Sequence, residues 1–392
     1  MATYKIAFAV PGRFDAFDFA HALLARGHDV TILTNYPAWA VARFGIPPNR
    51  VRSFWAHGVA SRVIHKYQRT PDSHWGEAAL HTMYGRWAAG VISREKWDMV
   101  FAWSGAAEEI LQSCNARNIP CVVTRGSAHI RTQHTLLAEE EKRIGLKIDK
   151  PTPWMIAREE REYQTAGLIR VLSSFALRSF VTEGIHQDRL WLNPPTADTS
   201  IFRPSAEAIQ ARQQRILSGA PLRVLFVGAL SYQKGAWDLA RVVNLVDNKH
   251  FSFRVVGPIA NECLPLVSTL QNRIDFIPKQ PQNDLPHQYG WGDIFLFPTI
   301  QDGFAVVLAQ AQVAGLPIVA TQNSGAPDII VENLNGWVVP IRSPELIIER
   351  LNWCDEHRSE LADMVEYAYQ TYQPRTWDDC ASEAEQMIAL VK

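Results

Sequence analysis

Residues 297–320 read Phe297-Pro-Thr-Ile-Gln-Asp-Gly-Phe-Ala-Val-Val-Leu-Ala-Gln-Ala-Gln-Val-Ala-Gly-Leu-Pro-Ile-Val-Ala320. The pattern predicts a strand end, a turn that contains Gly303, a helix and a second strand. Such a turn leaves backbone N–H groups unpaired at the positive end of the helix, where an anionic phosphate group binds. Asp302, at the mouth of the helix, carries oxygen atoms that can accept hydrogen bonds from sugar hydroxyls, unless it serves only as the helix N-cap. Gln310 follows eight residues later on roughly the same helix face and is otherwise a helix-surface glutamine.

The same strand–turn–helix order recurs in both halves of the chain, which predicts an α/β fold with parallel sheets. In the first half we expect helices over 15–26, 106–115 and 175–182, and strands over 5–10, 28–34, 98–103, 120–124 and 170–173. In the second half we expect helices over 205–214 and 236–246, and strands over 222–227, 253–256, 275–277, 293–297 and 317–320. Asn335-Gly336 is typical of a tight turn. The prediction is two Rossmann-like, doubly wound domains, residues 1–200 and 201–370, facing across a cleft, with a last helix in 371–392 that crosses back to the first domain. Tandem Rossmann dehydrogenases and periplasmic binding proteins share this outline.

Composition indicates a globular enzyme, because 47% of the 392 residues are hydrophobic and 20% are charged. The apolar run Tyr4–Val10 is too short for a signal-peptide core, and no run reaches the ~18 apolar residues of a membrane span. Five scattered cysteines without metal-ligand spacing favour a reducing compartment and no bound metal. We therefore expect a cytoplasmic protein.

The net charge of −1 hides an asymmetry along the chain. Residues 1–200 hold 24 Lys and Arg against 19 Asp and Glu, a balance of +5, and the remainder holds 15 against 21, a balance of −6. The stretch from Arg50 to Lys96 interleaves basic residues with aromatic ones, and its segment Val59–Tyr67 has an apolar helical face. One interpretation is an interfacial helix that holds the protein at the inner membrane face, near a lipid-linked acceptor. The other is an amphipathic helix packed on its own domain. Nothing else in the chain supports nucleic-acid binding.

Lys234 is the basic residue that the predicted turns place best for contact with a ligand. It lies between the strand that ends at Val227 and the helix that begins at Ala236, at the strand end where parallel sheets bind ligands. A cation at the positive end of a helix is electrostatically unfavourable unless an anion lies nearby. The sequence therefore predicts that Lys234 contacts a phosphate group.

These segments resemble the retaining glycosyltransferases of family 4, the glycosyl transferases group 1, which have the GT-B fold. Asp302-Gly303-Phe304-Ala305 resembles the Glu-Gly-Phe-Gly of that family, and Asp302 and Gln310 stand where the family usually has two Glu. The Gly228 segment keeps the basic Lys234 but has Ala229 where the family frequently has Arg. The resemblance is close from Leu222 to Pro340.

The resemblance implies a donor site for a nucleoside diphosphate sugar, with Lys234, Asp302 and His129 as the catalytic residues. By resemblance, Asp302 contacts the donor sugar, Gln310 the ribose, and the N–H groups of Phe304 and Ala305 the β-phosphate. The remaining donor-binding positions that it implies are Gly12, Arg125, Gly228, Pro278, Gly303, Ser324 and Gly325. Arg125 competes with His129 for contact with the donor sugar.

The resemblance also implies transfer of the sugar to an acceptor hydroxyl with retention of configuration. Members of the family commonly work in polysaccharide or glycolipid assembly, which is therefore the expected role. No metal or other cofactor is expected, and the absence of an obvious nucleophile favours a front-face mechanism in which the departing phosphate accepts the acceptor proton. Two alternatives stay open. The three departures at Ala229, Asp302 and Gln310 are compatible with a donor-binding or scaffold protein that has lost turnover, and nucleotide-sugar 2-epimerases share the fold.

Overall fold

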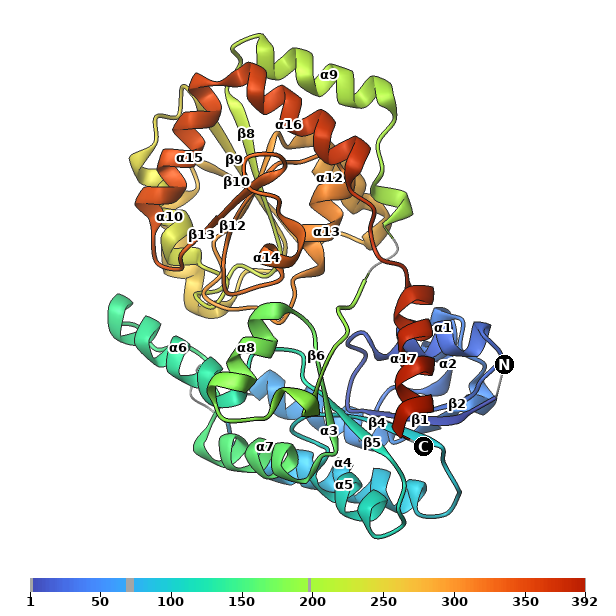
Figure 1. The fold of residues 1–392 in the computed structure, drawn as a ribbon. Coiled ribbons are helices and arrows are strands. Elements are labelled where there is room, and N and C mark those ends of the chain that lie inside the picture. Colours follow the sequence, from blue (N-terminus) through green and yellow to red (C-terminus); the bar gives the residue numbers. More distant parts are fainter. Residues whose placement is uncertain (1–2, 68–73, 197–198, 392) are drawn as a thin grey trace. The chain divides into compact units, whose positions relative to one another are not determined.

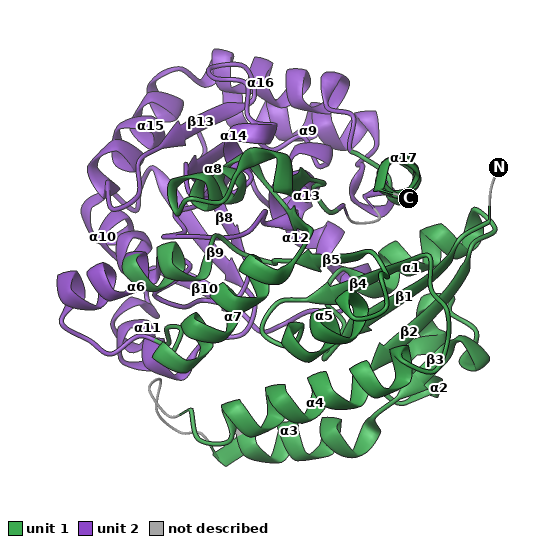
Figure 2. Cartoon of the chain, turned by 60° about the horizontal axis from the view of Figure 1, so that its bottom comes forward, with its two compact units in different colours: residues 1–135, 149–195, 375–392 green, residues 136–148, 196–374 purple. Residues whose placement is uncertain are grey.

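The computed structural model describes residues 3–67, 74–196 and 199–391. The chain forms two compact units, coloured separately in Figure 2. Unit 1 comprises Met1–Thr135, Asp149–Pro195 and Arg375–Lys392, and unit 2 comprises Leu136–Ile148 and Thr196–Pro374. Each unit contains one parallel sheet with helices packed on it, so both are Rossmann-like, as the sequence predicts (Figure 1).

The sheet of unit 1 has seven strands in the order β3-β2-β1-β4-β5-β6-β7, and every pairing is parallel. Side chains on both faces of its central strands are buried, which is why these strands read as continuous apolar runs rather than alternating ones. The strands are β1 (Lys5–Val10), β2 (Asp29–Thr34), β3 (Val51–Ser53), β4 (Met99–Trp103), β5 (Cys121–Thr124), β6 (Leu168–Val171) and β7 (Leu190–Leu192).

The helices of unit 1 begin where the sequence offers caps. Thr152 accepts a hydrogen bond from the N–H of Met155 at the start of α7, and Ser173 accepts one from Ala176 at the start of α8. The helices are α1 (Ala16–Ala25), α2 (Ala38–Val41), α3 (Trp55–Tyr67), α4 (Glu77–Ile92), α5 (Glu108–Asn115), α6 (Ile130–Ile144), α7 (Pro153–Thr165), α8 (Ser174–Thr182) and α17 (Trp377–Val391). The last helix, α17, lies beside α1 (Figure 1), where Glu385 pairs with Arg26 at 2.8 Å.

The sheet of unit 2 has six parallel strands in the order β10-β9-β8-β11-β12-β13. They are β8 (Leu222–Val227), β9 (Phe251–Val256), β10 (Ile274–Ile277), β11 (Ile294–Phe297), β12 (Ile318–Thr321) and β13 (Gly336–Val339). The helices are α9 (Ala206–Leu217), α10 (Ala236–Leu245), α11 (Leu264–Leu270), α12 (Leu285–Trp291), α13 (Val306–Val313), α14 (Ala326–Ile329), α15 (Pro344–Glu356) and α16 (Arg358–Thr371). The tight turn expected at Asn335-Gly336 is present over residues 333–335, and Gly336 begins β13, which pairs parallel with β12.

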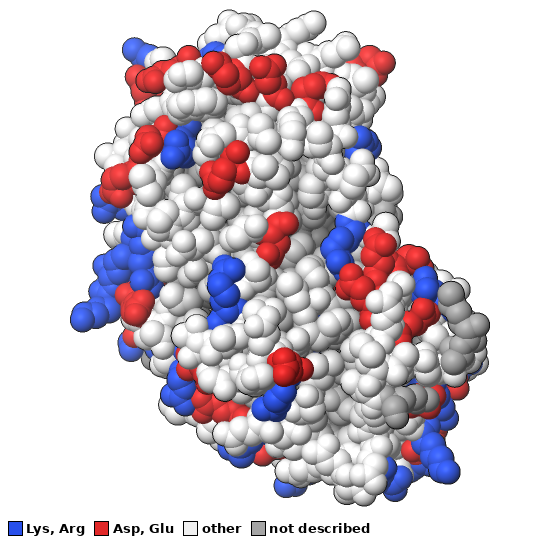
Figure 3. Space-filling model, in the orientation of Figure 1, with Lys and Arg blue, Asp and Glu red and all other residues white. Residues whose placement is uncertain are grey.

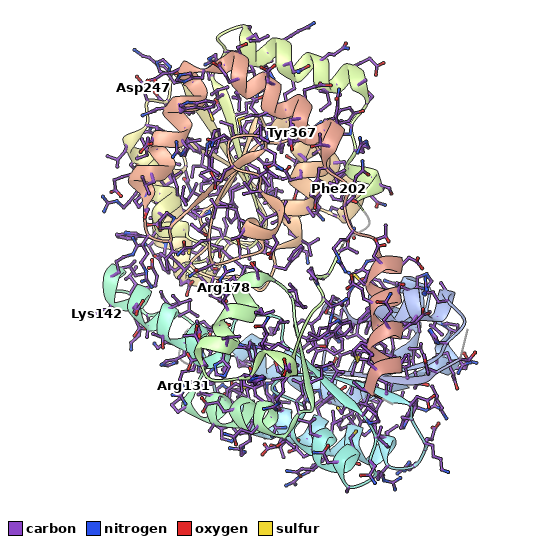
Figure 4. The ribbon with its side chains drawn as sticks, viewed as in Figure 1. Arg131, Lys142, Arg178, Phe202, Asp247 and Tyr367 are labelled. Carbon is purple, nitrogen blue, oxygen red and sulfur yellow. The ribbon has the colours of Figure 1, made fainter. Side chains whose placement is uncertain are left out.

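Helix α6 is shared between the units, which the predicted boundary at residue 200 does not anticipate. Figure 4 labels Arg131 near its start, in unit 1, and Lys142 near its end, in unit 2. Leu137 is fully buried in the core of unit 2. Arg342 holds the same part of the helix, with Nε 2.9 Å from Glu140 and Nη1 2.8 Å from Glu139. Buried apolar area and paired charge therefore assign residues 136–148 to unit 2.

The surface charges follow the asymmetry of the sequence. Figure 3 shows acidic side chains gathered over the end of unit 2 where α9 and α16 lie. Within the described residues, no helix is both long enough and apolar enough to cross a lipid bilayer.

Candidate functional site

Strands β8 and β11 lie side by side at the point where the strand order of unit 2 reverses. β8 is the first strand of the unit, with β9 on one side and β11 on the other. In open α/β sheets, ligands bind beyond the carboxyl ends of the strands at such a reversal. The loop that follows β8 carries Lys234, and the loop that follows β11 carries Asp302.

Lys234 and Asp302 form an ion pair at this edge. The distance from Lys234 Nζ to Asp302 Oδ2 is 2.5 Å, and the two side chains are 22% and 19% exposed. The other oxygen of Asp302, Oδ1, accepts a hydrogen bond of 3.2 Å from the N–H of Phe304. Asp302 is not the N-cap of α13, because the helix begins only at Val306, after Ala305. The carboxylate therefore holds the loop with one oxygen and the lysine with the other.

The two loops are fixed against each other by their backbones. The carbonyl oxygen of Gln233 accepts hydrogen bonds from the N–H of Ile300 at 2.9 Å and from Oγ1 of Thr299 at 3.1 Å. Gly235 has φ +81°, and a Cβ atom there would lie 1.9 Å from the carbonyl oxygen of Pro298. Only glycine allows this approach. The position of Lys234 relative to Asp302 is thus determined by the backbone and not only by the ion pair.

The loop after β12 joins the same edge. The N–H of Asp302 donates to the carbonyl oxygen of Asn323 at 2.8 Å, and the N–H of Gly325 donates to that of Phe304 at 2.9 Å. The hydroxyl of Ser324 is buried, where it donates to Thr321 O and accepts from Ala326 N. Ser324 and Gly325 therefore lie against the Asp302 loop, with the Ser324 side chain engaged in its own turn.

The start of α13 offers unpaired backbone donors. Ala305 precedes the helix in the left-handed conformation, with φ +66°. The N–H groups of Ala305, Val306 and Val307 donate to no group in the described part of the chain. The N–H of Phe304, which the sequence predicts to face a phosphate, is bonded to Asp302. Three donors at the positive end of a helix, with buried Gly303 just before them, lie next to the Lys234–Asp302 pair.

Gln310 is buried, with 7% of its surface exposed, so it is not a helix-surface residue. Its Oε1 accepts a hydrogen bond of 2.8 Å from the hydroxyl of Tyr289 on α12. Its Nε2 makes no hydrogen bond to any described residue. Tyr289 in turn packs against Phe202, which Figure 4 labels, with ring centroids 5.2 Å apart. Sequence reasoning missed Tyr289, because only the folded chain brings α12 to α13.

The other predicted positions of unit 2 lie at the carboxyl ends of strands. Gly228 follows β8 directly and has φ +147°, and Pro278 follows β10 directly. In unit 1, Gly12 follows β1 after one residue, and β1 and β4 are the strands at which the order of that sheet reverses. These residues share the ligand-binding edge of their own sheet.

Arg125 follows β5, but groups of unit 1 occupy its guanidinium. Nη1 lies 3.1 Å from Oε1 of Glu159, Nη2 donates to Gln133, and Nε donates to the carbonyl oxygen of Ala128. Burial lowers the pKa of Arg125, but the combined attraction of Glu159, Tyr163 and Glu162 outweighs it, so the pKa is raised. Arg125 therefore ties the loop to α6 and α7.

His129 is enclosed, with 3% of its surface exposed. Its ring packs against Tyr163 and Phe180, with centroids 4.9 and 5.0 Å away, and its Nδ1 accepts from the N–H of Arg131 at 3.3 Å. Burial, together with the positive charges of Arg125 and Arg131, lowers the pKa of His129 to about 4. The imidazole is neutral at pH 7, and a sugar reaches it only if this packing opens. Contact with a donor sugar stays a prediction.

Phe14, in the loop after Gly12, was not singled out by the sequence. It has φ +44° and is 63% exposed. A bulky side chain in the left-handed region is rare. The ring covers Gly12, where a Cβ atom would lie 2.9 Å from it.

Comparison with known proteins places this site in a family. Residues 208–371 match the model of the glycosyl transferases group 1. The chain is 29% identical to a D-inositol 3-phosphate glycosyltransferase from Corynebacterium efficiens over 264 residues, which cover 61% of each chain. It is 26% identical to a putative colanic acid biosynthesis glycosyltransferase, WcaL, from Salmonella typhimurium over 145 residues, 34% of this chain and 36% of that one. The chain spans about three fifths of the length of the first of these relatives.

Among solved structures, HepE from Anabaena in complex with UDP superposes with a TM-score of 0.70 at 15% identity, covering 98% of this chain and 100% of that one. This likeness concerns the fold, which is GT-B. The Lys234 and Asp302 loops both lie within the segment that the family model matches. Residues 208–371 thus belong to the glycosyl transferases group 1, within a chain of the GT-B fold.

Proposed function

We propose that this protein is a retaining glycosyltransferase that moves a sugar from a nucleoside diphosphate sugar to an acceptor hydroxyl. The observation that carries the proposal is the pairing of Lys234 with Asp302 beside three N–H groups at the start of α13 that have no partner among the described residues. A departing nucleoside diphosphate gains negative charge at its β-phosphate. An ammonium group and aligned backbone donors stabilise that charge without a metal ion.

Donor binding would exchange partners within the ion pair. A phosphate oxygen replaces Oδ2 of Asp302 as the partner of Lys234 Nζ, while Oδ1 stays bonded to Phe304. Oδ2 is then available to accept a hydrogen bond from a sugar hydroxyl. The same carboxylate can therefore fix the loop and orient the sugar, because a different oxygen serves each purpose.

Gln310 would offer a ribose a hydrogen-bond donor in the place where a glutamate would offer acceptors. Its Oε1 is occupied by Tyr289, so Nε2 is the atom that remains for a ligand. A glutamate in this place would accept hydrogen bonds from the ribose hydroxyls, whereas the amide nitrogen donates to a hydroxyl oxygen. We propose that the ribose is held through this donor.

Retention of configuration and a front-face mechanism accompany the proposal. In that mechanism the departing phosphate accepts the proton of the acceptor hydroxyl as the new glycosidic bond forms on the same face. The role in polysaccharide or glycolipid assembly is supported by the relatives, one of which is named a putative colanic acid biosynthesis glycosyltransferase and another a D-inositol 3-phosphate glycosyltransferase. HepE, with which the fold agrees, was crystallised with UDP. We propose a cytoplasmic enzyme, in peripheral contact with the membrane, that acts on a carbohydrate or lipid-linked acceptor.

The test is nucleotide release from UDP-, GDP-, ADP- and TDP-sugars by the wild type and by the variants Lys234→Ala and Asp302→Asn. We expect release from one donor, reduced about 10²- to 10³-fold by Lys234→Ala, the range measured for removal of one charge-stabilising donor elsewhere. Lys249→Ala, at an exposed lysine of the same unit, is the matched control and should release nucleotide as the wild type does.

Two other outcomes would replace the proposal. Tight binding of a nucleoside diphosphate without release, with every acceptor offered, would indicate the scaffold function. Interconversion of sugar nucleotides without release would indicate an epimerase. Once an acceptor is known, NMR of the product gives its anomeric configuration, and an inverted product would refute retention.

A further inference from the structure

Helix α3 carries apolar side chains on the side that faces solvent. Trp55, Val59, Val63 and Tyr67 are 63%, 49%, 49% and 60% exposed. They recur every four residues, so they form one stripe along the helix. An amphipathic helix of a globular protein normally points such a stripe at the core. Contiguous exposed apolar surface of this kind indicates an interaction site.

The orientation of α3 is fixed by its opposite side. His57 is 4% exposed, and its Nε2 lies 3.0 Å from the carbonyl oxygen of Leu80 on α4. Gly58 approaches the loop after β2 so closely that a Cβ atom would lie 2.3 Å from the carbonyl oxygen of Asn35. The helix cannot rotate its apolar stripe inward without breaking these contacts. In Figure 2, α3 lies at the edge of unit 1 beside α4.

The charges of α3 have one sign. Arg62 and Lys66 are exposed, and residues 55–67 contain no Asp or Glu. The guanidinium of Arg62 lies 5.5 Å from the centre of the Tyr36 ring, which holds it beside the stripe. In a symmetric dimer through this face, Arg62 and Lys66 of one copy would lie close to the same two cations of the other copy. Helix α3 carries no acidic side chain that could pair with them. An apolar stripe with basic and aromatic neighbours fits the boundary between acyl chains and anionic headgroups instead.

We infer that the α3 face, formed by Trp55, Val59, Val63, Tyr67, Arg62 and Lys66, docks on an anionic lipid bilayer. The helix lies in the plane of the interface, with the apolar stripe among the upper acyl chains and the two cations at the headgroups. The inference rests on the proposed function only in that a lipid-linked acceptor would be met there. Residues 68–73, which belong to the basic and aromatic stretch noted in the sequence, lie outside the described residues.

The experiment is cosedimentation of the full chain with vesicles of equimolar phosphatidylcholine and phosphatidylglycerol, and with vesicles of phosphatidylcholine alone. The apolar variant is Trp55→Gln with Val63→Gln, and the charge variant is Arg62→Gln with Lys66→Gln. Their matched controls lie on unit 2: Leu217→Gln with Leu245→Gln, at leucines 57% and 61% exposed, and Lys142→Gln with Lys249→Gln, at two exposed lysines.

We expect the wild type to bind the anionic vesicles and hardly bind the neutral ones. Each cation removed should lower the partition coefficient about fivefold. The apolar variant should have a partition coefficient at least about tenfold lower, because its two glutamines no longer bury the apolar area of Trp55 and Val63 in the bilayer. Both controls should bind as the wild type does.

Three results would overturn the inference. They are a wild type that does not sediment with anionic vesicles, α3 variants that bind as well as the wild type, and a wild-type dimer that the α3 variants convert to a monomer. Thermal unfolding of each variant checks that it is folded. Nucleotide release from a soluble donor, measured without vesicles, should be the same in all variants, so a failure of the proposed function is seen separately from a failure of lipid docking.

Discussion

Replacing Gly235 with alanine should disrupt the candidate site through the backbone alone. The added Cβ would lie 1.9 Å from the carbonyl oxygen of Pro298, which is 1.5 Å less than the 3.4 Å of an ordinary contact. Relief requires the loop after β8 to move away from the loop after β11. That movement breaks the two hydrogen bonds that Gln233 O accepts from Ile300 and Thr299.

The cost can be worked from these contacts. Two lost hydrogen bonds cost about 1 kcal/mol each, and an alanine in the left-handed region at φ +81° costs about 1 to 2 kcal/mol more. Gly235→Ala should therefore destabilise unit 2 by about 3 to 4 kcal/mol. Gly219 is the matched control, because it has φ +80° and nothing within 4 Å of the added Cβ, so Gly219→Ala carries only the conformational cost.

The assay is calorimetric unfolding of the full chain. Unit 2 contains 192 residues, the sum of 13 in Leu136–Ile148 and 179 in Thr196–Pro374. In a domain of this size 1 kcal/mol shifts Tm by about 2 to 4 °C, so the two variants, which differ by about 2 kcal/mol, should differ in Tm by about 4 to 8 °C. Gly235→Ala should also lose nucleotide release, since Lys234 moves with its loop. Equal Tm values for the two variants would refute the reasoning, because the steric contact would then carry no cost.

Three further predictions concern ionisation and burial. Burial lowers the pKa of His129 in the folded protein to about 4, below the value of about 6.5 in the unfolded chain. The neutral imidazole therefore contributes fully to stability above pH 6.5, and this contribution is lost as the pH falls toward 4. An NMR titration that finds a His129 pKa near 6.5 would contradict its burial. Hydrogen bonds from Arg26 lower the pKa of Glu385 to about 2, so this carboxylate stabilises unit 1 above pH 4.5 and less as the pH falls toward 2. The Tm difference between wild type and Glu385→Gln should shrink over that range, and a constant difference would count against the ion pair. Gln310→Leu leaves the buried hydroxyl of Tyr289 with only the long, 3.5 Å contact to the carbonyl oxygen of Val307 and should cost about 1 to 3 kcal/mol in denaturant unfolding, whereas an unchanged midpoint would show that the bond to Gln310 is dispensable.

The local sequence was sufficient for most elements of both sheets. Continuous apolar runs such as Ile6–Val10 mark buried parallel strands, and the structure has β1 over Lys5–Val10, the range expected. Shorter elements escaped: β3 and β7 have three residues each, too few for a pattern to stand out. The strand expected over 170–173 lies instead at Leu168–Val171, because Ser173 is the cap of the following helix.

The candidate site was partly readable for the same reason. Lys234 and Asp302 each stand at a strand–helix turn, and turns of parallel strands collect at one edge of a sheet. Their ion pair was not readable, since the two residues lie 68 positions apart and meet only because β8 and β11 are neighbours. The bond between Tyr289 and Gln310 escaped for the same reason.

What the sequence by itself determined is therefore the set of elements and the turns that carry polar residues, because periodicity and turn chemistry act over a few neighbouring residues. The tertiary structure decided burial and partnership. It enclosed His129, a candidate for contact with the donor sugar, between Tyr163 and Phe180. It left the apolar stripe of α3 in solvent, although the sequence was equally compatible with a helix packed on its own domain. Burial depends on which distant segments pack against a side chain, and that information is held in strand order and helix packing rather than in any local pattern.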